Sequence, residues 1–95
     1  MRLFLMLFRG FVSYDLSMGL FFKLFRQDVI TKVDGVKGIK EIKGRYYGNN
    51  EVIDVVILVN STLDIKEAHD IATHVEKVMM KDYGVFDVHV HVEPN

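Results

Sequence analysis

The sequence contains no cysteine among its 95 residues. Disulfides and thiolate metal sites are therefore excluded, and a transition-metal site would have to use imidazole and carboxylate ligands. An excess of basic charge is also missing, because 12 lysines and arginines stand against 13 aspartates and glutamates. Nucleic-acid-binding modules usually show a strong basic excess. We therefore expect no nucleic-acid partner.

Long apolar runs and catalytic motifs are missing too. No stretch approaches the roughly 20 apolar residues that a membrane-spanning helix needs, so the chain is expected to be soluble or at most peripheral. The stretch "GVKGIKEIKG" has neither the spacing nor the strand-to-helix context of a phosphate loop. Ser13, Ser17 and Ser61 have no nucleophile motif around them. These absences predict that the protein is not an enzyme.

Apolar side chains are abundant instead. Hydrophobic residues make up 49% of the chain and aromatic residues 12%, which is enough for a packed core and unlike disorder. A chain of this length forms one small domain that buries only about two thirds of its surface on folding. An oligomer or a bound metal would therefore add useful stability.

The first 26 residues differ from the rest, being rich in phenylalanine and leucine with Asp15 as their one acidic residue. Arg9 interrupts the apolar run and no small-residue cleavage site follows, which argues against a signal peptide. A basic segment of this kind could lie on a membrane surface, which is the only membrane contact expected. The alternatives are a linker, a remnant, a tag or a helix that packs on a partner.

Residues 27–95 are better organised. Val29, Ile30 and Val33 predict a short helix that ends near Gly35. Residues 38–45 then alternate apolar and polar side chains, and "GNN" separates them from the β-branched run "EVIDVVILVN". This pattern predicts a β-hairpin.

A second helix and a third strand follow. Asp64 and Glu67 form a capping-box pattern, and Gly84 is expected to end the helix. Apolar residues recur at helical spacing between them: Ala68, Ile71, Ala72, Val75, Val78 and Met79. The final stretch "VFDVHVHVEP" alternates as a strand does. The order helix, strand, strand, helix, strand predicts an α+β open-faced sandwich with both helices on one face of a three-stranded mixed sheet.

The histidines suggest a metal site. His91 and Glu93 share one face of the last strand, roughly 6.6 Å apart, and could converge on one ion. His69 lies at the border of the apolar stripe and could be a third ligand, with water or a partner chain completing the set. His89 is a spare candidate, whereas His74 falls on another side of the helix. The alternative to a metal site is an ordinary amphipathic strand whose polar face is exposed to solvent.

An ordered set of motifs resembles the cytosolic C-terminal domain of cation diffusion facilitator metal transporters. These motifs are "GVKGI", "RYYG", "IDVVILVN", "EAHDIATHVE" and "HVEP", spread over residues 33 to 94. The resemblance implies a metallochaperone-like, ferredoxin-like fold and a homodimer on the cytoplasmic side of the membrane, beneath a transmembrane transport domain. It also implies binding of Zn²⁺ or another divalent transition-metal ion, with His69, His91 and Glu93 as ligands.

Two positions depart from the family pattern. Lys40 and Val56 stand where some members carry further histidines, so a single or partner-completed site is expected rather than a two-metal site.

Three functions remain open for this domain: a metal-responsive regulatory and dimerisation domain, a purely structural dimer module whose metal site has decayed, and a small-ligand-sensing α/β domain. In the dimer, the interface is expected near the outer face of the sheet or the third strand.

Overall fold

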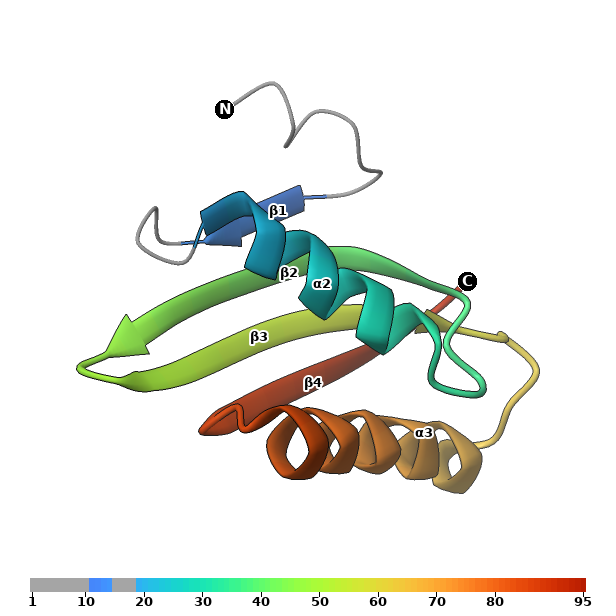
Figure 1. The fold of residues 1–95 in the computed structure, drawn as a ribbon. Coiled ribbons are helices and arrows are strands. Elements are labelled where there is room, and N and C mark those ends of the chain that lie inside the picture. The colour runs from blue at the N-terminus through green and yellow to red at the C-terminus, as the bar shows by residue number, and fades with distance from the viewer. Residues whose placement is uncertain (1–10, 15–18) are drawn as a thin grey trace.

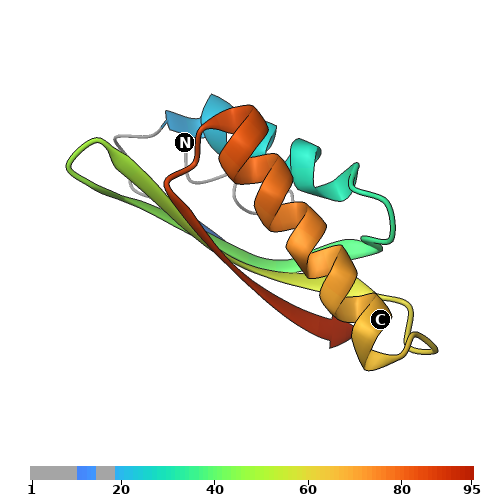
Figure 2. The same cartoon turned by 90° about the horizontal axis from the view of Figure 1, so that it is seen from below.

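The sheet lies on one side of the molecule and the helices on the other (Figures 1 and 2). The computed structural model describes residues 11–14 and 19–95. Within that part of the chain the elements run in the order β1 (Phe11–Tyr14), α2 (Gly19–Thr31), β2 (Gly38–Tyr47), β3 (Asn50–Val59), α3 (Ile65–Lys77), the π-helical turn η2 (Val78–Asp82) and β4 (Asp87–Pro94).

The first helix, α2, is longer than predicted at its start and shorter at its end. It ends at Thr31, four residues before the expected stop at Gly35. The Thr31 hydroxyl bonds back to the carbonyl of Asp28 at 2.9 Å, and the Lys32 and Val33 amides bond to carbonyls three residues back. These tighter turns replace the last turn of the α-helix. The residues that indicated the helix, Val29, Ile30 and Val33, are all buried as expected.

Strands β2 and β3 form the predicted antiparallel hairpin. Tyr47 pairs with Asn50, so the loop contains only Gly48 and Asn49. Gly48 has a φ of 63° and is the one loop residue with positive φ, as in a type II′ turn. The side chains of Ile53, Val55 and Ile57 are fully buried beneath the helices, and the residues between them face the opposite side of the sheet.

Helix α3 begins at the predicted capping box. The Glu67 amide donates to the Asp64 carboxylate at 2.7 Å, and the Asp64 amide donates to Glu67 at 3.1 Å. Its apolar stripe packs on the sheet, with Val75 and Met79 fully buried. The helix loosens into η2 and ends before Gly84, whose φ is 68°. Gly84 therefore ends the helical segment as predicted.

The connection through α3 brings β4 alongside β3 in parallel, as predicted. The mixed sheet β2–β3–β4 with helices on one face is thus confirmed. The structure adds β1, which pairs with β2 in parallel from Phe11 opposite Glu41 to Tyr14 opposite Gly44. A four-residue strand is too short for periodicity to indicate it. The sequence interpretations of residues 1–10 and 15–18 lie outside the described residues.

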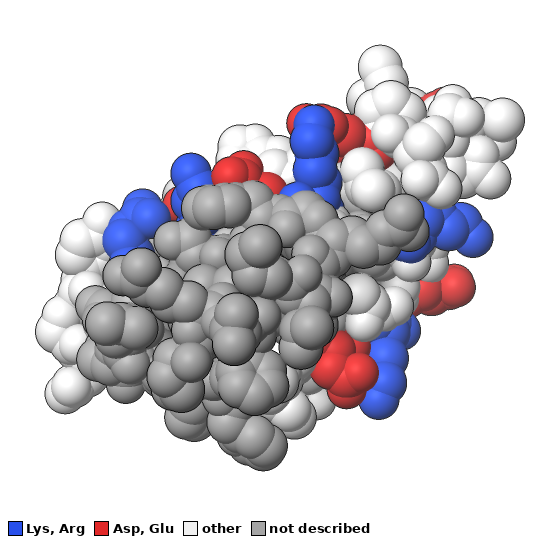
Figure 3. All heavy atoms as spheres, turned by 90° about the horizontal axis from the view of Figure 1, so that it is seen from above, with Lys and Arg blue, Asp and Glu red and all other residues white. Residues whose placement is uncertain are grey.

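Charges of both signs are interspersed on the described surface. In the face shown in Figure 3, lysine and arginine side chains lie next to acidic ones. The outer face of the sheet carries the same mixture, with Lys43 near Glu41 at 3.7 Å and Arg45 near Asp54 at 3.2 Å. This mixture follows from the near-zero net charge of the sequence.

Candidate metal site

The candidate site lies on β4, which forms one edge of the described sheet. Val88 is 4% exposed and faces the core, so the alternate residues His89, His91 and Glu93 leave from the outer face. Both histidines are exposed and Glu93 is half-buried. The predicted division of this strand into an apolar and a polar side is confirmed.

Two of these three side chains already have partners. The Nε2 atom of His89 lies 3.1 Å from a carboxylate oxygen of Asp87. Lys40 on β2 donates from Nζ to Oε1 of Glu93 at 2.8 Å. This hydrogen bond, followed by the charge of Glu93, raises the pKa of Lys40 above its ordinary value of 10.5. Lys40 therefore carries its full positive charge at neutral pH.

His91 is the most available donor of the strand. It is exposed and pairs in register with Val56, whose side chain has no donor atom. Among the described residues, no hydrogen bond or ion pair involves the His91 imidazole. Its lone pair is therefore open to a cation from solvent.

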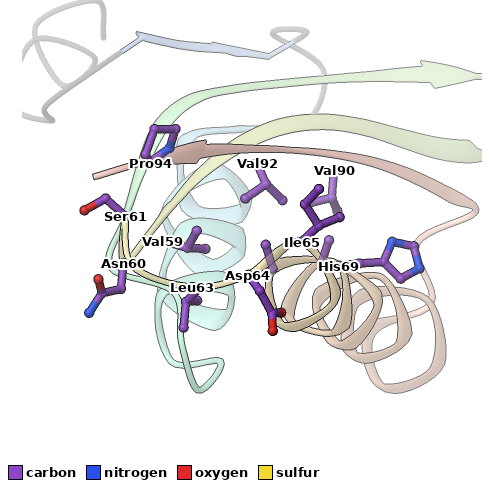
Figure 4. A pocket seen from close by; sticks show the side chains of 12 residues that line it. Val59, Asn60, Ser61, Leu63, Asp64, Ile65, His69, Val90, Val92 and Pro94 are labelled. Carbon is purple, nitrogen blue, oxygen red and sulfur yellow. The ribbon is translucent and has the colours of Figure 1, made fainter.

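His69 belongs to a different layer. It lies on α3 and lines a groove of about 390 Å³ together with Val90 and Val92 on the inner side of β4. Figure 4 shows the His69 ring at one end of this groove, opposite the end formed by Asn60 and Ser61. His69 thus approaches β4 from the helix side, whereas His91 and Glu93 leave β4 from the other side.

His74 is also separate from these residues. It lines a second groove, between α2 and α3, with Asp28, Lys32 and Asp82 among its neighbours. This position agrees with the expectation that His74 and His69 do not share an ion.

The described part of the chain brings no three histidine or acidic side chains close enough to hold a metal ion. Imidazole from His91 and carboxylate from Glu93 have the right chemistry for a divalent transition metal. Their number falls short, because a protein zinc site normally uses three or four protein ligands. Any complete site at this face would need donors from water, from the residues outside the described ranges or from another chain.

Sequence reasoning missed the ion pair between Lys40 and Glu93. The pattern showed Lys40 only as a departure from the family motif, with no indication of which carboxylate it meets. The contact depends on an irregularity of β2, since the pairing with β3 shifts between Ile39 and Glu41. The sequence marks this shift only by the spacing of Ile39 and Ile42, which lie three positions apart and interrupt the alternation.

Within residues 11–14 and 19–95, no helix has the length and hydropathy that crossing a membrane requires.

The known proteins to which this chain is similar include two bacterial efflux proteins. The chain is 41% identical over 68 residues to the manganese efflux system protein MneS of Bacillus subtilis, covering 72% of this chain and 23% of that protein. It is 30% identical over 73 residues to the cation-efflux pump FieF of Klebsiella pneumoniae, covering 74% and 24%. The chain thus spans about a quarter of the length of these relatives.

Solved structures of the MamM CTD share the fold. One variant superposes with a TM-score of 0.77 at 21% identity, covering 83% of this chain and 98% of that chain. Another, a manganese form, has a TM-score of 0.72 at 22% identity and covers 77% of this chain and 94% of that chain. The profile of one family, "Cation efflux protein, cytoplasmic domain", matches residues 27–95. The chain therefore belongs to the family of cytoplasmic domains of cation efflux proteins, a family of transporter domains and not of enzymes.

Proposed function

We propose that residues 27–95 form the regulatory and dimerisation domain of a divalent metal cation efflux transporter. In this proposal the domain binds a metal ion that stabilises or regulates a homodimer held beneath a transmembrane transport domain. The observation that carries it is the pairing of family membership with an open imidazole, His91, beside a carboxylate, Glu93, on an exposed strand. Within residues 1–26, Phe11–Tyr14 and the first part of α2 pack with this domain as β1 and a covering helix.

The proposed ligand set is His91 and Glu93, with His69 as a third donor. Because His69 stands on the other side of β4, the three side chains cannot act as one preformed site within the described chain. A second copy of the domain supplies the missing donors in this proposal. Metal binding would then be coupled to dimer formation, since the complete site exists only in the assembly.

The ion is proposed to be zinc or manganese. Imidazole with carboxylate suits Zn²⁺, while carboxylate-rich sites also accept Mn²⁺. The names of MneS and of the MamM CTD manganese form support including manganese. Selectivity depends on geometry and ligand number as well as on intrinsic affinity.

The test is a calorimetric titration of the chelator-stripped domain at neutral pH, with ZnCl₂ and MnCl₂ in turn. Saturable binding, together with a rise in melting temperature and in the dimer fraction by light scattering, is the expected result. A dimer that forms equally well in chelator and releases no heat with either ion would contradict the metal proposal and favour a purely structural module.

A small-ligand-sensing domain is the second candidate function. The groove between α3 and β4 supports it, because about 390 Å³ lined mainly by apolar side chains lies within the usual range of ligand pockets. Thermal stabilisation by an amino acid or nucleotide, with none by metal, would favour this candidate. Such a ligand would protect His69, which lines the groove, from chemical modification, whereas His91 would stay reactive.

A further inference from the structure

We infer that the ammonium group of Lys40 is a built-in cation that holds Glu93 and thereby sets how strongly this domain binds a divalent metal. The inference rests on the proposed function, since it concerns the regulation of the same pair, His91 and Glu93. It assigns a specific role to a lysine that the sequence shows only as a replacement for a ligand.

The backbone of β2 is shaped so that Lys40 faces the outer side of the sheet. Ile39 packs against the core and Ile42 is fully buried, so both point to the helix side. Regular alternation cannot place two residues three positions apart on the same face. The shift in pairing between Ile39 and Glu41 resolves this conflict as a β-bulge does, by inserting one extra residue. Lys40 is that residue.

From this position Lys40 reaches across the sheet to β4. Its Nζ atom lies 2.8 Å from Oε1 of Glu93, while the intervening strand β3 contributes Leu58, which pairs with both Gly38 and Glu93. The ion pair therefore joins two strands that are not hydrogen-bonded neighbours in the sheet. One oxygen of the candidate ligand is already bound to a cation that belongs to the chain.

A divalent ion that binds Glu93 has either to displace Lys40 from Oε1 or to bind the other carboxylate oxygen close to a positive charge. The two side chains are 59% and 44% exposed, so solvent weakens their attraction and the carboxylate can exchange between lysine and metal. Repulsion between the ammonium group and the incoming ion acts in the same direction as the competition. Lys40 thus reduces affinity without closing the site.

Lys43 provides a matched control. It lies on the same strand and the same outer face, and its Nζ atom is 3.7 Å from Glu41, which is not a proposed ligand. Lys43→Gln therefore removes one positive charge from the same surface and leaves the contact of Glu93 intact. A general change in surface potential would appear in both variants, whereas release of Glu93 would appear in Lys40→Gln alone.

The experiment titrates wild type, Lys40→Gln and Lys43→Gln with ZnCl₂ and MnCl₂ by calorimetry, after thermal melting has shown that all three are folded. Removal of the ion pair and its charge is expected to lower the Kd for metal by roughly tenfold in Lys40→Gln, against less than about twofold in Lys43→Gln. Without metal, the carboxyl ¹³C resonance of Glu93 should move in Lys40→Gln and stay in place in Lys43→Gln.

The outcomes separate this inference from the proposed function. If all three proteins bind metal equally and His91→Ala does not, the proposed function stands and the role of Lys40 is wrong. If neither wild type nor Lys40→Gln binds either ion, both are wrong. Equal strengthening in the two lysine variants would also overturn the inference, because it would reflect surface charge alone.

Discussion

Arg26 on α2 and Glu51 on β3 form a buried, bidentate ion pair. Arg26 donates from Nε to one oxygen of the Glu51 carboxylate at 3.0 Å and from Nη2 to the other at 2.8 Å. Both side chains are only 7% exposed. The guanidinium carbon also lies 5.9 Å and 6.0 Å from the ring centres of Phe25 and Tyr83, which pack edge to face. This cluster fixes α2 to the sheet at the start of β3.

Neutralising one member of this ion pair should destabilise the folded protein. Glu51→Gln removes the buried negative charge that faces the Arg26 guanidinium, so we expect the free energy of unfolding to fall by about 3–5 kcal/mol. Urea denaturation at fixed protein concentration measures this change. The control is Lys66→Ala, which breaks an exposed ion pair with Asp70. It should lower the free energy of unfolding by less than about 0.5 kcal/mol. Similar losses in both variants would contradict the assigned importance of burial.

Gly35 is expected to tolerate no side chain. Its φ is 95°, and an added Cβ would lie 2.5 Å from Cδ1 of Ile71 on α3. Gly35→Ala should therefore lower the free energy of unfolding by roughly 1–3 kcal/mol through backbone strain, with a further loss from the clash. Gly48→Ala has a positive φ of 63° and open space around it, so it measures strain alone. Equal costs at the two positions would show that Ile71 moves aside freely.

The capping box of α3 should contribute measurably to the free energy of unfolding. Asp64→Ala removes the acceptor of the Glu67 amide, and we expect a loss of about 1 kcal/mol in urea denaturation. Asp64→Asn keeps an oxygen that can accept the same bond and should restore most of the loss. An asparagine variant as unstable as the alanine variant would indicate that charge matters more than the hydrogen bond.

Identical substitutions should separate the core from the surface. Ile53 is fully buried under the helices, so Ile53→Val should cost about 0.5–1.5 kcal/mol through the lost methylene and the cavity it leaves. Ile65 is 89% exposed at the start of α3, and Ile65→Val should stay within about 0.5 kcal/mol of wild type. A clear loss at Ile65 would show that this position is covered in the assembled protein.

The ligand proposal makes a prediction for the histidines. His91→Ala should abolish saturable metal binding in calorimetry, because it removes the imidazole next to Glu93. His74→Ala removes a histidine of the groove between α2 and α3 and should bind metal as wild type does. Undiminished binding by the His91 variant would exclude β4 as the site.

Local patterns predicted most of the fold. The capping box at Asp64 and Glu67, the turn at Gly48 and the alternation from Val88 to Glu93 all act between residues close in sequence, so the chain itself specifies them. The right-handed crossover rule predicted the parallel pairing of β3 with β4, and the family motifs added the expected dimer and transport-domain partners. The end of α2 was wrong by four residues, because the amides of Lys32 and Val33 bond three residues back instead of four and such a change leaves no periodic signal.

Only the tertiary structure decided how distant residues meet. The sequence placed His69, His91 and Glu93 in one candidate set, but α3 lies on the inner side of β4 and separates His69 from the other two. The bulge at Lys40 and the pair of Arg26 with Glu51 likewise depend on strand pairing and helix docking. The sequence by itself therefore determined which elements form, because caps, turns and hydrophobic periods are local. Packing determined which charges face each other, because register and bulges are set by the partner strand.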